Sequence, residues 1–341
     1  MNDPRKLLSV LLITTAAAFA ATDLDPASHK QIMAYYETSG SYASLHSFYR
    51  YMNQLPTDTF AVDIRGNLSG SAPGPALSFA RSKGMLTFAT ISNFGATDFD
   101  PKIAHAVVTN PLRKARFISN ALKVVQTSNY SGVNIDFEAV PHKDRAAFST
   151  FIHDVACAMR SGGYLTVVSV PAELKDDPND SWTGAFNFRS LGRDADILQL
   201  MTYDENGPWG PPGPVAGMDW VTPCAQYAVS VVSPGKVSLG VPAYGYDWNT
   251  TLTTGVQVPW KSIPALISST GATPQWDTTS SSPYFTYQAG DGSSHTVWYE
   301  DTTSISLKSR LVVSEDLAGV SVFALGFEDQ DFWMAIHSGG F

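Results

Sequence analysis

Eight short apolar segments recur along the chain of 341 residues, and helical periodicity separates them. They begin near residues 31, 58, 85, 131, 163, 196, 236 and 319. Strands that alternate with helices form parallel sheets, because each strand needs a crossover to return to the same edge. This count and order predict an α/β fold, a (β/α)8 TIM barrel. An open doubly wound sheet is the alternative, but no Gly-x-Gly-x-x-Gly loop follows the first segment.

The interval between the last two segments is much longer than the others. Its residues 249–297 mix helical periodicity, Gly/Ser turns and short strand patterns such as 284–287. We expect a small α+β insertion there, at the functional end of a single catalytic barrel that spans residues 22–341.

The first 21 residues have the pattern of a secretory signal. Arg5 and Lys6 precede an apolar run over residues 7–20, which ends in small residues. A membrane anchor is the alternative, but the run is shorter than the roughly 20 residues that a spanning helix needs. We expect a signal peptide at 1–21, and a protein that is secreted or lies in the periplasm or cell envelope.

The charge balance excludes some partners. The chain has 22 Lys and Arg against 31 Asp and Glu, a net charge of −9, and no basic run is longer than two residues. This argues against nucleic acid and, once the signal is removed, against a membrane surface as partners. We expect a monomer.

The histidines and cysteines give no sign of a metal site or a disulfide. The seven histidines are scattered without His-x-His or His-x-x-x-His spacing, so we expect no metal and no cofactor. Cys157 and Cys224 lie in helical patterns two units apart around the predicted barrel, and we expect two buried free thiols. A disulfide between them, which an exported protein could form, is the alternative.

The fourth segment, residues 130–140, carries the most pronounced polar pattern. Asn134, Asp136 and Glu138 are separated by apolar residues, so a strand places all three on one face. Active groups of such barrels gather at the carboxyl ends of the strands. Two acids at this spacing indicate general acid–base catalysis, since each raises the pKa of the other. A structural ion pair with a nearby Lys or Arg is the alternative.

Other polar and aromatic residues follow the predicted strands at the same end of the barrel. They are Tyr35, Tyr36, Glu37, Ser92, Asn93, Tyr203, Asp204, Tyr244 and Tyr246. Trp209, Trp220 and Trp248 lie in adjoining loops. Aromatic rings suit the apolar faces of sugars, so the mouth of the barrel is predicted to bind a carbohydrate.

Several segments resemble glycoside hydrolase family 18, the chitinase family. Ser131-Gly-Val-Asn-Ile-Asp-Phe-Glu138 resembles its Asp-x-x-Asp-x-Asp-x-Glu signature, with the last two acids intact. Leu200-Met-Thr-Tyr-Asp204 resembles its Met-x-Tyr-Asp motif. Further similar segments lie at 92–95, 240–248 and 297–300, and the match runs from about 29 to 337.

Within that family, the chain is most similar to the branch of bacterial spore-cortex and related peptidoglycan glucosaminidases. That branch tends to have Asn at the position of Asn134. It also reads Asn-Ile-Asp-Phe-Glu and Met-Thr-Tyr-Asp-Glu, as this chain does at 134–138 and 201–205.

The resemblance implies a retaining hydrolase of β-linked N-acetylglucosamine polymers, either peptidoglycan or chitin. Glu138 would protonate the glycosidic oxygen while the 2-acetamido group of the substrate attacks the anomeric carbon and forms an oxazolinium ion. Asp136 would orient the acetamido N–H, and Tyr203 would hydrogen-bond its oxygen. The implied substrate-binding residues are Asn134, Asn93, Tyr36, Met201, Asp204, Tyr244 and Phe323.

Two departures from the family pattern modify this expectation. Ser131 and Asn134 replace signature acids, so we expect Asp136 to have no carboxylate at that position with which to share a proton, although Asn134 can still donate to it. Phe323 stands where many members have Trp. A catalytically silent glycan-binding protein is the alternative function. Such lectins typically lose the acid that this chain keeps as Glu138.

Overall fold

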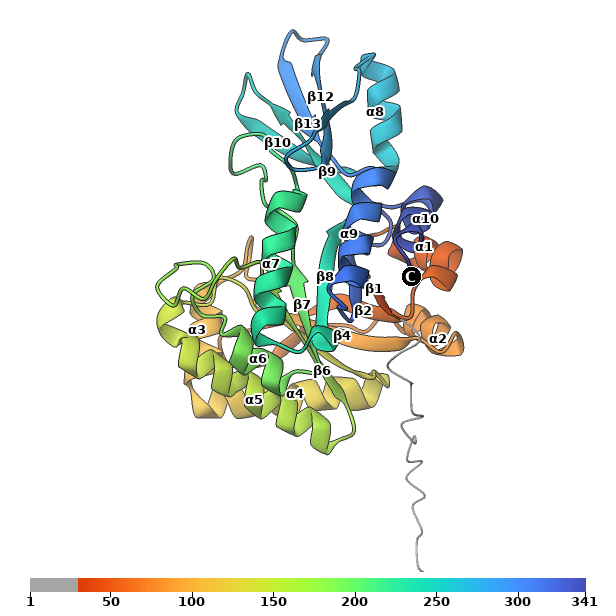
Figure 1. The fold of residues 1–341 in the computed structure, drawn as a ribbon. Helices are drawn as coiled ribbons and strands as arrows, with labels where there is room; N and C mark the ends of the chain where they lie inside the picture. The colour runs from red at the N-terminus through yellow and green to blue at the C-terminus, as the bar shows by residue number, and fades with distance from the viewer. Residues whose placement is uncertain (1–29) are drawn as a thin grey trace, which may run out of the picture.

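The computed structural model describes residues 30–341 and shows a closed barrel of parallel strands surrounded by helices (Figure 1). The predicted signal peptide, 1–21, lies outside the described residues. The barrel strands are β1 (Gln31–Ala34), β2 (Gln54–Val62), β4 (Leu86–Ser92), β5 (Gly132–Asp136), β6 (Leu165–Pro171), β7 (Ile197–Met201), β8 (Val237–Pro242) and β14 (Gly319–Phe323). β1 pairs in parallel with both β14 and β2, which closes the ring. The predicted TIM barrel is confirmed.

Helices cover the outside of the barrel between successive strands. They are α1 (Ser41–Phe48), α2 (Gly74–Ser82), α3 (Pro101–Thr109), α4 (Pro111–Ser128), α5 (Arg145–Ser161), α6 (Phe188–Asp194), α7 (Met218–Val231), α9 (Thr302–Ser314) and α10 (Gln330–Ser338). β3 (Leu68–Gly70) pairs antiparallel with β2 outside the ring. None of the helices within 30–341 is long and apolar enough to cross a bilayer.

The start of α4 shows how local sequence sets these boundaries. The Asn110 side chain accepts hydrogen bonds from the backbone N–H groups of Leu112 and Arg113, and Pro111 occupies the first helical position. The helix ends at Asn129, whose left-handed backbone (φ 58°) turns the chain toward β5.

Register divides the barrel strands into two faces. Outward residues such as Val133, Ile135 and Phe137 are fully buried against helices, and the Phe137 ring stacks 5.3 Å from that of Phe151 on α5. The inward-facing residues change from apolar to polar along these strands. Phe88 and Val167 belong to an apolar cluster, and the inward positions after them are polar. The polar end of the interior therefore coincides with the carboxyl ends of the strands.

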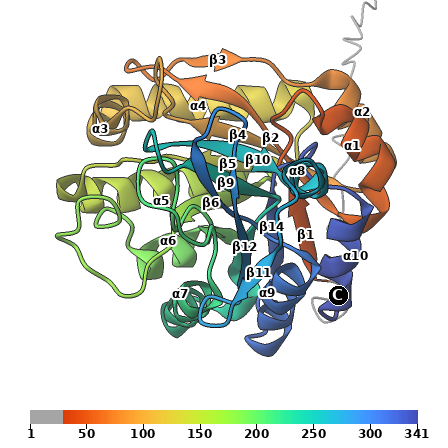
Figure 2. The same cartoon turned by 90° about the horizontal axis from the view of Figure 1, so that it is seen from above.

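The small domain predicted between the last two barrel strands is a five-stranded antiparallel sheet with one helix. Its elements are β9 (Tyr244–Asn249), β10 (Thr254–Pro259), α8 (Ile263–Thr270), β11 (Gln275–Asp277), β12 (Ser282–Gln288) and β13 (Ser294–Trp298). The sheet begins earlier than the expected boundary at 249, because β9 continues almost directly from β8. Seen from above, it lies over the carboxyl end of the barrel (Figure 2).

The cysteine prediction was half right. Both thiols are free, and Cys224 is buried, but Cys157 is exposed. The buried residues of α5 include Val155, Ala156 and Met159, so position 157 falls on the solvent face of that helix.

A buried ion pair joins the insertion to the barrel. Glu300 follows β13, and its Oε2 lies 2.7 Å from Nζ of Lys308 on α9, with both side chains fully buried. The Ser304 hydroxyl donates to the same oxygen at 2.5 Å. The pair therefore fixes the point where the chain returns from the insertion to the barrel.

Replacing Lys308 with Met should reduce the free energy of unfolding by about 3–5 kcal/mol, because it leaves Glu300 as a buried charge without a partner. Urea denaturation of the two proteins measures this difference. The double variant Glu300→Leu/Lys308→Met should recover much of the loss, since neither charge then remains buried. A single-variant loss below about 1 kcal/mol, typical of surface pairs, would contradict this role.

Candidate active site

Strand β5 carries the two central acids into the mouth of the barrel. Asn134 and Asp136 pair in register with Thr90 and Ser92 of β4, and all of these face the interior. Asp136 is 8% exposed, and Asn134 is completely buried. Glu138 follows the strand at the rim.

Two hydrogen bonds connect Tyr35, Asn134 and Ser169 inside the barrel. The Tyr35 hydroxyl donates to Oδ1 of Asn134 at 2.6 Å, and Nδ2 of Asn134 donates to Oγ of Ser169 at 2.9 Å. Asn134 was expected to donate to Asp136, but in this structure its Nδ2 donates to Ser169 instead.

Asn93 holds the backbone of Glu138 in place. Its Nδ2 donates to the Glu138 carbonyl at 2.9 Å, while its Oδ1 accepts from the Glu138 N–H at 2.8 Å. The next residue, Ala139, has a left-handed backbone (φ 51°), so the chain turns sharply after the acid. Asn93 was predicted to contact substrate, but in this structure both ends of its amide are occupied by the protein backbone.

Aromatic residues and Asp204 form the opposite side of the mouth. The Phe323 ring lies 5.8 Å from the Tyr203 ring and 6.0 Å from the Tyr35 ring. Oδ1 of Asp204 accepts hydrogen bonds from the hydroxyls of Tyr244 at 2.7 Å and Tyr246 at 2.8 Å.

Two of the predicted substrate-binding residues, Met201 and Tyr36, lie on opposite faces of the barrel wall. Met201 ends β7 on the inward face, in register with Pro171, and is half-buried. Tyr36 pairs with Thr57, whose hydroxyl bonds Tyr130 outside the barrel, and packs against the outer core. The structure therefore does not bring Tyr36 together with the acids. Its neighbour Tyr35 points inward instead.

The three tryptophans predicted near the mouth also differ in their surroundings. Trp248 is buried and donates to the carbonyls of Gly207 and Gly210, so it supports the loop after β7. Trp220 packs against the outer core. Only Trp209 of these three is exposed, at 73%, and its ring lies 6.4 Å from that of Tyr246.

Burial and mutual repulsion raise the pKa values of the acids in the mouth. Burial, followed by the nearby Asp58 carboxylate, raises the pKa of Asp136 to about 8. Burial, followed by Asp136 and Asp204, raises the pKa of Glu138 well above its usual range. A carboxyl group with such a pKa remains protonated near neutral pH and can act as a general acid.

Sequence reasoning missed Asp58 and overlooked the part played by Tyr35 and Ser169. The position of Asn134 supplies no carboxylate, as expected, but Asp58 on β2 contributes, after burial, to the raised pKa of Asp136. The alternation of Thr57, Asp58 and Thr59 was visible in the sequence, but only the register with β4 shows that Asp58 faces inward.

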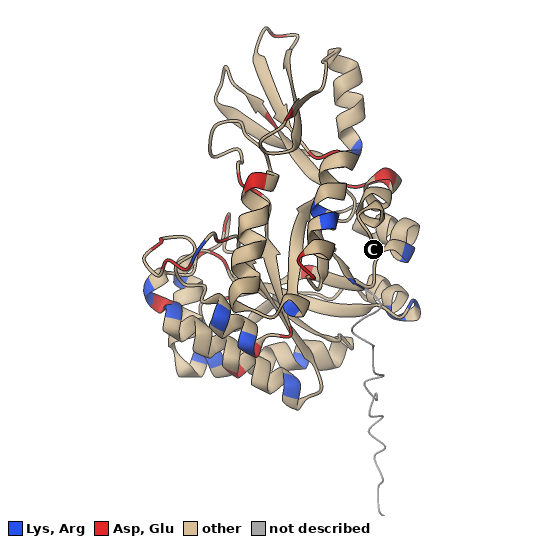
Figure 3. Ribbon diagram, viewed as in Figure 1, with Lys and Arg blue, Asp and Glu red and all other residues tan. Residues whose placement is uncertain are grey.

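Lys and Arg lie mainly on the helices at the base of the barrel, such as α4 and α5 (Figure 3).

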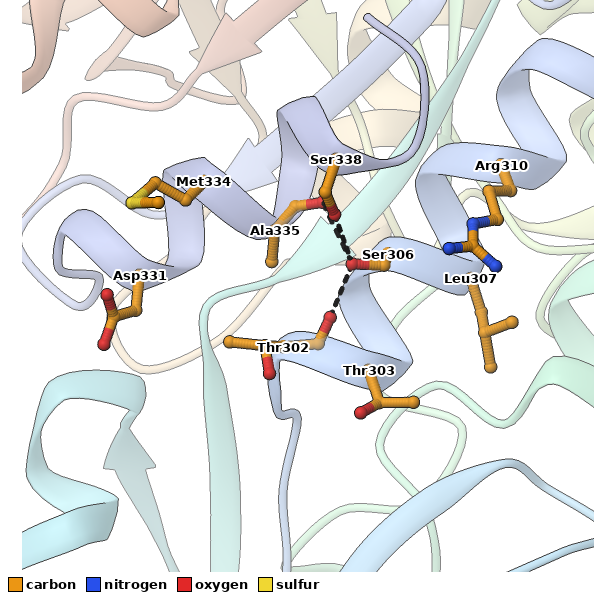
Figure 4. A pocket seen from close by; sticks show the side chains of 9 residues that line it. All are labelled: Thr302, Thr303, Ser306, Leu307, Arg310, Asp331, Met334, Ala335 and Ser338. Carbon is orange, nitrogen blue, oxygen red and sulfur yellow. Dashed lines mark hydrogen bonds between the residues drawn. The ribbon is translucent and has the colours of Figure 1, made fainter.

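A cavity of about 470 Å³ lies between α9 and α10 on the outer surface, lined by residues including Ser306, Arg310 and Met334 (Figure 4). It contains none of the acids described above. Residues 30–341 contain no group of three or more His, Cys, Asp or Glu side chains placed to hold a metal.

Asn93→Ala should lower kcat more than it raises KM, because it releases the backbone that positions Glu138. It should also reduce the free energy of unfolding by about 1–3 kcal/mol, since buried backbone groups lose their partners. Steady-state kinetics on chito-oligosaccharides and urea denaturation measure both effects. Asn93→Asp keeps the acceptor but loses the donor, so it should fall between Ala and the parent. Unchanged kcat in Asn93→Ala would contradict this positioning role.

Known proteins are similar to this chain in sequence and in fold. The model of glycosyl hydrolases family 18 matches residues 79–329. The uncharacterized glycosylase YvbX of Bacillus subtilis (strain 168) is 40% identical over 304 residues, which cover 88% of each chain. The cortical fragment-lytic enzyme of Bacillus cereus is 27% identical over 248 residues, 71% of this chain and 57% of that enzyme. A chitinase structure from Chromobacterium violaceum ATCC 12472 is 38% identical with a TM-score of 0.86, and covers 91% of this chain and 99% of that one. The chain belongs to glycoside hydrolase family 18 and is a glycosidase.

Proposed function

We propose that this protein is an exported, monomeric, retaining glycosidase that cleaves β-linked N-acetylglucosamine chains of chitin or peptidoglycan. The observation that carries the proposal is the placement of Glu138, a clamped acid with a raised pKa, beside the buried Asp136. The relatives named as a chitinase and as cortical fragment-lytic enzymes support this range of polymers. The sequence pattern of residues 1–21 supports export.

The geometry favours attack by the acetamido group of the substrate over attack by a carboxylate of the protein. Asp136 and Glu138 leave the same strand on the same side of the mouth, and Asp136 lies beneath the rim. The facing acid, Asp204, accepts two phenol hydrogen bonds and is thereby held in place. With these acids engaged, the acetamido oxygen of the bound sugar is the nucleophile available to the anomeric carbon.

In this mechanism Glu138, Asp136, Tyr203 and Phe323 have different roles. Glu138 donates its proton to the leaving oxygen and later takes a proton from the attacking water. Asp136 accepts the acetamido N–H and stabilises the positive charge of the oxazolinium ion. Tyr203 donates to the acetamido oxygen, and Phe323 packs beneath the sugar.

Glu138→Gln should reduce kcat on chito-oligosaccharides by about 10²–10⁴-fold, because the amide cannot donate the proton. The shape of the site is retained, so binding measured by calorimetry should remain. Glu315→Gln, at the far end of α9, is the matched control and should keep full turnover. Full turnover by Glu138→Gln would refute the catalytic role, and binding without turnover in the parent protein would favour a silent glycan-binding protein.

Substrate assistance predicts the identity of the sugar at each new reducing end. With partially deacetylated chitosan, mass spectrometry should find only N-acetylglucosamine there, since a free amine cannot form the oxazolinium ion. Products with glucosamine at the new reducing end would contradict the mechanism. Parallel digests of chitin and purified peptidoglycan glycan strands identify the preferred polymer.

A further inference from the structure

Strand β2 brings a carboxylate toward Asp136 from outside the signature motif. Asp58 pairs in register with Thr90 of β4, and Thr90 pairs with Asn134 of β5. Neighbouring residues in register point to the same side of a sheet. Because Thr90 and Asn134 face the barrel interior, Asp58 does so as well, one level below Asp136.

An irregularity in β2 follows Asp58. The register with β4 shifts between Asp58 and Phe60, so Thr59 is an extra residue in the strand. On the outer face, the Thr57 hydroxyl lies 2.6 Å from that of Tyr130. The Asp58 N–H donates to the carbonyl of Tyr36 at 3.0 Å. These contacts hold the backbone on both sides of Asp58, so its side chain is directed toward the barrel interior.

No cation neutralises either acid. Among residues 30–341, no Lys, Arg or His forms an ion pair with Asp58 or Asp136. Two ionised carboxylates in such a buried place repel each other strongly, and the repulsion is relieved when one of them keeps a proton.

We propose that Asp58 shares a proton with Asp136 and is the positioning residue that replaces the acid missing at Asn134. The proposal rests on the proposed function. In the free protein the shared proton lies on Asp136. When Asp136 turns to accept the acetamido N–H, the proton moves to Asp58, so Asp136 becomes ionised and Asp58 neutral. No proton is exchanged with solvent in this step.

The other groups around the pair agree with this assignment. Burial raises the pKa of Asp58 to about 6 and contributes most to the value of about 8 for Asp136. Glu37, after β1, adds a third acid whose pKa rises to about 7 through burial and Asp58. Tyr35 from β1, Tyr203 from β7 and Glu138 also face Asp136, and β4 contributes only Thr90 and Ser92. Each facing side chain is therefore neutral or acidic.

Asn134 explains why the partner must come from another strand. Its Oδ1 accepts from Tyr35 and its Nδ2 donates to Ser169, so both ends of the amide are engaged. An amide cannot take up a proton in this pH range. The position therefore cannot exchange a proton with Asp136.

Carbon-13 NMR of labelled carboxyl groups tests the proposal directly. In the parent protein, the resonances of Asp58 and Asp136 should each follow the same two titration steps, as expected for a coupled pair. In Asp58→Asn, Asp136 should titrate in one step, shifted down by about one pH unit or more, because a neighbouring negative charge is gone. The same variant should have a lower kcat with little change in KM.

Asp98→Asn is the matched control. Asp98 raises the pKa of Glu138 but is not among the charges that act on Asp136. This variant should therefore shift the titration of Glu138 more than that of Asp136. The parent protein needs no variant to show the shared steps, so the test stands even where Asp58→Asn folds poorly.

The outcomes separate this inference from the proposed function. Independent single steps for Asp58 and Asp136 in the parent protein, or an unshifted Asp136 in Asp58→Asn, would overturn proton sharing whatever the activity. Shared steps in a protein that cleaves no N-acetylglucosamine chain would leave the pair intact and refute the proposed function instead.

Discussion

The burial of negative charge inside the barrel is the constraint on which the active site depends. Asp136 lies almost completely out of water, and the nearest charges are other acids. A buried carboxylate without a cation is tolerated only when donors point at it or a proton neutralises it. Burial and the neighbouring acids make retention of a proton on Asp136 favourable. Burial and the same repulsion raise the pKa of Glu138, as its proposed role of general acid requires.

Closure of the barrel determines which residues take part in this arrangement. In a ring of parallel strands, residues in register share a face, and inward side chains from different strands meet near the axis. Asp58, Thr90 and Asn134 form such a row across β2, β4 and β5. The outward face of β5 is fully apolar, so a slip of one residue would place the acids among the helices. Burial of the apolar face of β5 in the hydrophobic core therefore keeps the acids on the inward face, at the mouth of the barrel.

Much of the fold could be predicted from the sequence because apolar periodicity and helix signals such as Pro111 are local. The residues of β5 were predicted to face the right way for the same reason. The errors arise where only tertiary register decides. Tyr36 was preferred to Tyr35, a difference of one residue that changes the face of the strand. The strand that contains Asp58 was expected to begin at this residue, and at the start of a strand no alternation indicates which side a residue faces. In the structure this strand begins earlier, at Gln54.

The departure at Asn134 therefore has a different meaning once the barrel is considered as a whole. A motif on one strand includes only the residues of that strand, whereas the pKa of a buried acid depends on every nearby charge, whichever strand carries it. The interior of a barrel offers several positions from which a second carboxylate can approach Asp136, and β2 uses one of them. Replacement of a signature acid by an amide consequently removes a residue type from β5 without removing carboxylate coupling from the site. The amide at this position instead accepts a hydrogen bond from Tyr35 and donates one to Ser169.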